Sequence, residues 1–168
     1  MTDMNQSTGM PGDKPSLPSG LNILTILTFI GSGLGFFFSI YSCINAKSSV
    51  DKMEEAISSP TYDSLPSFAK KMLSPEALEI ARKSYENRIP ILAISLIGIA
   101  LCTYGALQMR KRKMQGYYTY LIGEVIPFLV MPIFLGMAAL TGMIGIVSIC
   151  IVLLFVLLYT GQRKHLTE

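Results

Sequence analysis

Residues 117–140 read YYTYLIGEVIPFLVMPIFLGMAAL, an apolar stretch with one acidic residue, Glu124, and two prolines, Pro127 and Pro132. It is long enough for a transmembrane helix, because about 20 apolar residues cross the hydrocarbon core of a bilayer. Moving a carboxylate into hydrocarbon costs about 2.5–3.5 kcal/mol, so we expect Glu124 to face protein or water. Each proline removes a backbone hydrogen bond, so we expect both to kink this span.

Three further apolar runs predict three more spans. In a chain of 168 residues, 51% of them hydrophobic, the four spans lie near 21–44, 89–109, 117–140 and 143–160. We therefore predict an all-α, four-span transmembrane helical bundle covering residues 21–162. Residues 1–20, rich in Gly, Pro and Ser, are expected to form a disordered tail, and 163–168 a short second tail. The first span is too long for a signal peptide and should stay in the mature protein.

Basic residues indicate the orientation. Between the second and third spans lies a compact group, the basic cluster, formed by Arg110, Lys111, Arg112 and Lys113. Arg163 and Lys164 follow the fourth span. The positive-inside rule then places both termini and the basic cluster in the cytoplasm and residues 45–88 outside. The net charge of +3 is an orientation signal, and we expect no nucleic-acid partner.

The outer segment, residues 45–88, repeats apolar residues three and four positions apart, which predicts two or three short amphipathic helices. Ser64 and Ser74, each close to a following proline, are expected to be helix N-caps, and Ser19 is expected to cap the first span. Three interpretations remain open for these helices. They cap the outer mouth of the bundle, dock another protein, or form a lid over a small ligand.

Two glycines in the first span, Gly31 and Gly35, lie four residues apart. Small residues at this spacing let a second helix approach closely, so we expect a packing seam within the bundle or between two copies of the chain.

Counting residues from the turns places four side chains at the depth of Glu124, namely Thr28, Thr103, Tyr104 and Tyr159. This predicted polar intramembrane layer has three interpretations. Glu124 holds the bundle together through hydrogen bonds, it couples transport to a proton or cation, or it acts as a general acid or base. Tyr117, Tyr118 and Tyr120 begin the third span, where we expect an interfacial aromatic belt.

Motifs for chemistry are missing from the sequence. The cysteines, Cys43, Cys102 and Cys150, lie in different spans without a C-x-x-C pair, and the single histidine, His165, lies in the C-terminal tail. No P-loop or nucleophile motif is visible. We therefore expect a protein that is not an enzyme, with no catalytic residues, no cofactor and no metal site.

Two stretches, LNILTILTFIGSGLG at 21–35 and YTGQRKHLT at 159–167, resemble uncharacterised four-helix proteins of bacterial inner membranes, particularly of the Bacteroidota. The layout is similar too, with a Pro/Ser-rich tail, an outer helical segment, a basic second turn and an intramembrane Glu. The resemblance implies a fold and an inner-membrane location. That family has no assigned activity, so it implies no site residues.

These observations predict an integral membrane protein that contacts lipids and binds other membrane proteins, or itself, as a non-enzymatic subunit or scaffold. The alternative is a small proton- or ion-coupled transporter that uses Glu124.

Overall fold

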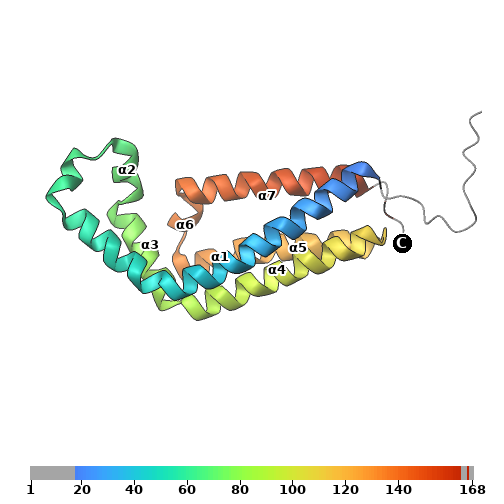
Figure 1. Cartoon of the computed structure of the whole chain (residues 1–168), viewed down its shortest axis with the longest axis horizontal. Coiled ribbons are helices and arrows are strands. Elements are labelled where there is room, and N and C mark those ends of the chain that lie inside the picture. Colours follow the sequence, from blue (N-terminus) through green and yellow to red (C-terminus); the bar gives the residue numbers. More distant parts are fainter. Residues whose placement is uncertain (1–17, 164–165, 167–168) are drawn as a thin grey trace, which may run out of the picture.

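The computed structural model describes residues 18–163 and 166, and in this part the chain is all-α (Figure 1). Four helices are long and apolar enough to cross a membrane: α1 (Ser19–Ser58), α4 (Arg88–Arg110), α5 (Met114–Leu135) and α7 (Met143–Gln162). The prediction of a four-span helical bundle is therefore confirmed, and the protein is a multi-pass membrane protein in contact with lipid. Of the disordered tail expected over residues 1–20, residues 1–17 lie outside the described residues, and residues 19 and 20 belong to α1.

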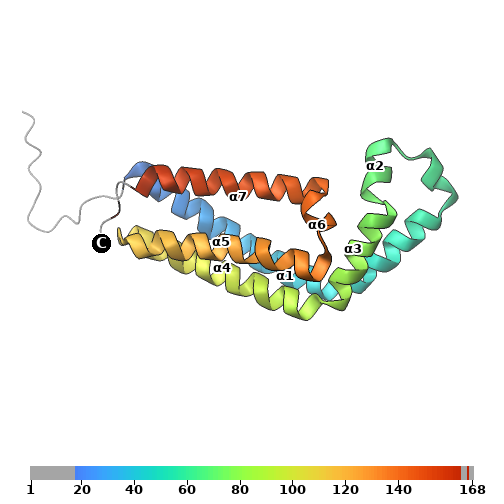
Figure 2. The ribbon, with the colours of Figure 1, turned by 180° about the vertical axis from the view of Figure 1, so that it is seen from behind.

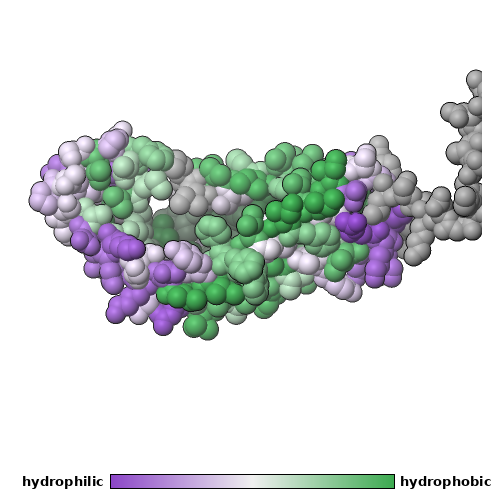
Figure 3. Space-filling view, in the orientation of Figure 1, coloured by the Kyte–Doolittle hydropathy of each residue, from purple (hydrophilic) through white to green (hydrophobic). Residues whose placement is uncertain are grey.

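The four long helices run side by side, with hydrophilic ends and a hydrophobic middle. Figures 1 and 2 show them from opposite sides, with the α4–α5 turn at the same end of the bundle as the start of α1 and the end of α7. Figure 3 shows a hydrophobic surface over the long helices and hydrophilic residues at both ends of the molecule. This pattern suits a protein whose middle lies in hydrocarbon and whose ends lie in water.

The first helix continues well past its apolar run. At about 1.5 Å per residue, the 40 residues of α1 give a helix about 60 Å long. The hydrocarbon core of a bilayer is about 30 Å thick, half that length. The first of the short helices predicted within residues 45–88, near Val50, is not separate. These residues continue α1 as far as Ser58. Beyond the bundle, the last turns of α1 together with η1 (Pro60–Ser64), α2 (Ser67–Met72) and α3 (Pro75–Glu86) form a projection that we call the outer arm (Figure 1).

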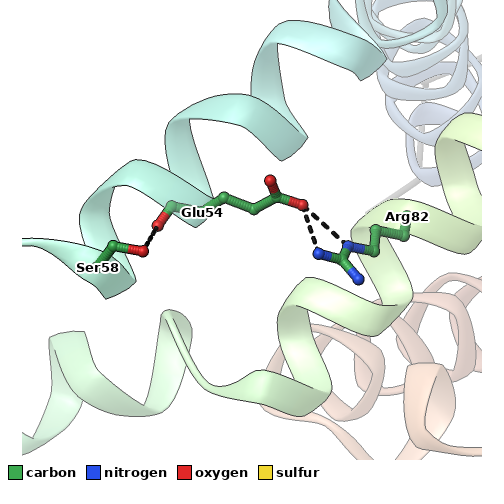
Figure 4. A network of polar contacts seen from close by, with 3 residues as sticks. All are labelled: Glu54, Ser58 and Arg82. Atoms are coloured by element: carbon green, nitrogen blue, oxygen red, sulfur yellow. Dashed lines mark hydrogen bonds and ion pairs between the residues drawn. The ribbon is translucent and has the colours of Figure 1, made fainter.

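An ion pair joins the two long sides of the outer arm. Arg82 of α3 donates from Nε and Nη2 to Oε1 of Glu54 on α1, at 3.0 and 2.6 Å (Figure 4). Within α3, Lys83 lies 2.6 Å from Glu79 and lowers the pKa of that carboxyl below its usual value by hydrogen bonding and charge. Both pairs are solvent-exposed, so each adds only modest stability.

One of the three predicted serine caps is present. The Ser74 hydroxyl accepts a hydrogen bond from the amide of Ala77 and caps α3. The other two predictions are wrong. Ser19 is the first residue of α1, after Pro18, and the Ser64 hydroxyl donates to the carbonyl of Thr61 within η1. In both cases a proline occupies the N-cap position, Pro18 for α1 and Pro66 for α2.

The third long helix is shorter than the predicted 117–140. It runs through Pro127 and Pro132 and ends at Leu135, because Gly136 adopts φ 84°, a left-handed conformation that favours glycine. The Gly136 amide donates to the carbonyl of Pro132. The short α6 (Ala138–Thr141) then leads into α7.

The buried core lies at the end of the bundle that carries the basic cluster. Its fully buried side chains include Leu21 of α1, Met109 of α4, Tyr120 of α5 and Tyr159 of α7. The prediction that Tyr117 and Tyr120 lie in an interfacial belt is therefore wrong, because both side chains are buried inside the bundle. Only Tyr118, 50% exposed, lies at the surface.

Candidate functional site

The carboxyl group of Glu124 is held from within its own helix. The Tyr120 hydroxyl, one turn earlier on α5, donates a 2.7 Å hydrogen bond to Oε1 of Glu124. Residues four apart on a helix lie on the same face, so Tyr120 reaches the carboxylate without a bend in the backbone. The Tyr120 side chain is 1% exposed, and the hydrogen bond therefore lies against the core.

A second hydrogen bond joins the first and last long helices. The hydroxyls of Thr28 on α1 and Tyr159 on α7 lie 2.7 Å apart, and either could be the donor. The rings of Tyr159 and Tyr120 pack with centroids 4.5 Å apart. Thr28, Tyr120, Glu124 and Tyr159 thus form one contiguous group from three helices, which we call the polar layer.

The other two side chains predicted at this depth lie elsewhere on α4. The Thr103 hydroxyl donates to the carbonyl of Ile99 in its own helix, and the Tyr104 side chain is 55% exposed on the outside of the bundle. Counting residues from a turn gives the depth of a side chain along a helix but not the side of the helix on which it lies. At 3.6 residues per turn, adjacent side chains point in different directions. Sequence reasoning missed Tyr120, although its spacing of four from Glu124 on a helix was a usable signal.

Glycines bring α4 and α5 into direct backbone contact. A Cβ at Gly105 would lie 2.7 Å from the carbonyl oxygen of Gly116, and one at Gly116 would lie 2.6 Å from that of Gly105. Further along the same contact, a Cβ at Gly123 would lie 2.8 Å from Sγ of Cys102. We call this contact the glycine seam. It fixes α5 against α4, with the Tyr120 ring packed on Tyr159 of α7.

The Glu124 side chain lines a cavity of about 340 Å³ between α1, α4, α5 and α7, here called the first cavity. Its polar lining comes from Glu124, Thr28, Ser32, Ser95 and Tyr120. Most of the remaining lining is apolar, with side chains that include Leu27, Ile99, Pro127, Ile151, Val152 and Phe155. A single carboxyl group in a mainly apolar cavity of this size matches the general form of small-molecule sites.

A second cavity of about 260 Å³ lies along α5 and α7. Pro127 lines both, and the second cavity extends to Leu135, Leu140 and Gly145 near the α6 end of the bundle. In the other direction, Tyr120 lines the first cavity, and its ring packs on the buried ring of Tyr159. The space around Glu124 therefore lies between the second cavity, on the side of the outer arm, and the buried core, on the side of the basic cluster.

The glycines predicted as a packing seam in α1 lie apart from the glycine seam. Gly31 lines the first cavity, and a Cβ added there would meet nothing within 4 Å in the described part of the chain. A Cβ at Gly35 would make ordinary contact with Ile99, at 3.5 Å. Only Gly35 thus packs against a neighbouring helix of the same chain.

The basic cluster forms the turn between α4 and α5. The turn spans residues 111–113, because α4 ends at Arg110 and α5 begins at Met114. Arg112 has φ 59°, and the amide of Lys113 donates to the carbonyl of Gln108, which closes the turn tightly. The Arg110 guanidinium lies 6.0 Å from the ring centroid of Phe29 on α1.

No family model, curated protein or solved structure matches this chain. The resemblance to four-helix inner-membrane proteins of the Bacteroidota therefore stays a prediction.

Proposed function

We propose that this four-span membrane protein is a small proton- or ion-coupled transporter, not an enzyme, in which Glu124 binds the transported or coupling cation. One observation carries the proposal. Glu124 lines a cavity of about 340 Å³, a second cavity that shares Pro127 with it lies toward the outer arm, and the buried tyrosines Tyr120 and Tyr159 lie on the side of the basic cluster. Intramembrane carboxyl groups that face cavities are frequent features of ion and proton pathways.

The polar layer supports the two states that a transporter needs. Tyr120 holds Oε1 of Glu124, and the Tyr120–Tyr159 contact forms the barrier on the side of the basic cluster. A shift of α7 relative to α5 would break this barrier without disturbing the glycine seam, which involves only α4 and α5. We infer that α1 and α7 move against a rigid α4–α5 pair, and that the protein acts as an oligomer when it encloses a pathway.

We further propose that the membrane is the bacterial inner membrane, with both termini and the basic cluster in the cytoplasm. Under this orientation the second cavity lies on the outer side of Glu124. Cysteine substitutions provide the test. A cysteine at Lys111 in a background without native cysteines should react with membrane-impermeant maleimide only after cell lysis, and one at Lys71 should react in intact spheroplasts.

Transport itself is tested in proteoliposomes that contain a pH-sensitive dye. The wild-type protein should move protons under an imposed cation gradient, and Glu124→Gln should abolish this flux while keeping its abundance and its size-exclusion profile. Tyr104→Phe, at the exposed surface of α4, is the matched control and should transport normally. Flux that survives in Glu124→Gln, or loss of folded protein in that variant, contradicts the proposal.

A second function, a subunit or scaffold that binds another membrane protein, is favoured by the outer arm. Phe68 and Met72 of α2 are 60% and 46% exposed in a region beyond the long bundle helices, where apolar exposure to water is costly. A purification in mild detergent distinguishes this function. A defined partner that remains bound to the wild type and is lost in Phe68→Ser/Met72→Ser would support it, with Ser67→Ala as the control.

A further inference from the structure

We propose that the first cavity binds an organic monocation, a molecule with one positively charged amine or ammonium group and an apolar body. This inference rests on the transporter function proposed above, since it names the substrate class of the same site. The carboxyl of Glu124 supplies one negative charge at the edge of a volume of about 340 Å³. Sites for small organic molecules typically occupy about 300–1,000 Å³, whereas a bare metal ion needs far less space.

The lining of the cavity separates charge recognition from apolar contact. Glu124 and the hydroxyl-bearing residues Thr28, Ser32 and Ser95 provide the polar part, and apolar side chains of α1, α4, α5 and α7 provide most of the rest. Metal ions such as Mg²⁺ and Ca²⁺ require several oxygen ligands, including more than one charged group in most sites. A cavity with one carboxyl group and a mostly apolar lining matches a cation whose charged group is attached to an apolar body.

Aromatic rings on two sides favour the same class of ligand. Phe155 of α7 and Tyr120 of α5 both line the cavity, and Tyr120 is fixed there by its hydrogen bond to Glu124 and its contact with Tyr159. Aromatic faces attract ammonium groups, by about 0.5–2 kcal/mol for each well-placed ring. A quaternary ammonium group could therefore bind between the carboxylate and the rings without donating a hydrogen bond.

The glycines of α1 provide a matched pair of variants for the test. A leucine at Gly31 would occupy the first cavity, because Gly31 lines it and nothing lies within 4 Å of an added Cβ. Gly33 is equally free of contacts but does not line the cavity. Gly31→Leu and Gly33→Leu thus add the same side chain to the same helix, and only the first change removes the volume that the ligand needs.

The experiment measures binding of radiolabelled benzyltrimethylammonium to the purified full-length protein in lipid nanodiscs, with empty nanodiscs subtracted. We expect saturable binding that falls at least about tenfold in both Glu124→Gln and Gly31→Leu and is unchanged in Gly33→Leu. Neopentylbenzene, in which carbon replaces the charged nitrogen, should not displace the label. Because the ligand cannot lose a proton, any effect of Glu124→Gln arises from the protein and not from a change in the ligand's charge.

Three results would overturn the proposal: no saturable binding, displacement by neopentylbenzene at equal concentration, or an equal loss of binding in Gly31→Leu and Gly33→Leu. Failure of the transporter function looks different. If benzyltrimethylammonium binds as expected while proteoliposomes show no Glu124-dependent flux, the site stands and transport is refuted. If Glu124-dependent proton flux is present without binding of this cation, transport stands and the organic substrate class is refuted.

Discussion

The hydroxyl of Tyr120 lies 2.7 Å from Oε1 of Glu124, one helical turn away on α5, and the Tyr120 ring also packs on Tyr159 of α7. Tyr120 therefore connects the carboxyl group of the polar layer to a helix far away in the sequence. Its hydroxyl satisfies one carboxyl oxygen, and Tyr120 also lines the first cavity.

We expect Tyr120→Phe to lower the free energy of unfolding by about 1–2 kcal/mol, because it removes a donor to a carboxyl group in an environment of low polarity but keeps the buried ring. Reversible unfolding in mixed detergent micelles measures this loss. Tyr118→Phe is the control, since Tyr118 lies on the same helix and is 50% exposed. Equal losses in the two variants would show that the hydrogen bond to Glu124 contributes nothing specific.

Adding a methyl group to the glycine seam should be more costly. In Gly116→Ala the new Cβ would lie 2.6 Å from two backbone atoms of α4, the carbonyl oxygen of Gly105 and the amide nitrogen of Met109, so the helices must separate. We expect a loss of about 1–3 kcal/mol, as in other overpacked contacts. Gly33→Ala, where a Cβ meets nothing within 4 Å, should be neutral or stabilising by up to about 1 kcal/mol. Comparable stability of the two variants would contradict the close α4–α5 contact.

The hydrogen bond between Thr28 and Tyr159 should appear as an energetic coupling between α1 and α7. We expect Thr28→Val and Tyr159→Phe each to destabilise the protein, and the double variant to lose less than the sum by about 0.6 kcal/mol, a typical value for hydrogen bonds within membranes. Thr103→Val combined with Tyr159→Phe is the control cycle, because the Thr103 hydroxyl bonds to its own helix. Strict additivity for Thr28 and Tyr159 would refute the contact.

The Glu54–Arg82 pair should hold the two sides of the outer arm together. Arg82→Ala removes both hydrogen bonds to Glu54, so we expect faster amide hydrogen exchange near residue 54 and in α3, with no change in the long bundle helices. The expected loss is about 0.2–1 kcal/mol and should shrink at high salt, because the pair is exposed. Lys83→Ala is the matched control, since its partner Glu79 lies on the same helix. Unchanged exchange in Arg82→Ala would show that the ion pair does not order the arm.

The number of long helices could be predicted from the sequence because the length of an apolar run is a direct measure of its capacity to cross a bilayer. Counting from the turns also placed Thr28, Glu124 and Tyr159 at one depth. In the structure the hydroxyls of Thr28 and Tyr159 are hydrogen-bonded. Thr28 and Glu124 line the same cavity, and Tyr159 packs on Tyr120, the neighbour of Glu124. The rotation of α4 could not be obtained in this way. It depends on which face carries Gly98 and Gly105 against α5, and that pairing became visible only with both helices in place.

The end of α5 was missed for a different reason. The apolar run continues without a break through Gly136, so hydropathy alone extends the helix to residue 140. Glycine is compatible with a helix but also with the left-handed conformation that ends this one, and the choice is made by the return of the chain through α6. Similarly, Tyr117 and Tyr120 match an interfacial belt by composition, and they are buried only because α1, α4 and α7 pack around them.

The glycine seam also bears on how the chain assembles during synthesis. Helices α4 and α5 are joined by a turn of three residues and touch through their backbones, so they can pair as soon as both have left the ribosome. This hairpin should enter the bilayer as one unit. Helix α7, which is synthesised last, can then pack against the preformed hairpin. A substitution that weakens the contact between α4 and α5 should therefore lower the yield of mature protein, because more of the newly made chain is degraded.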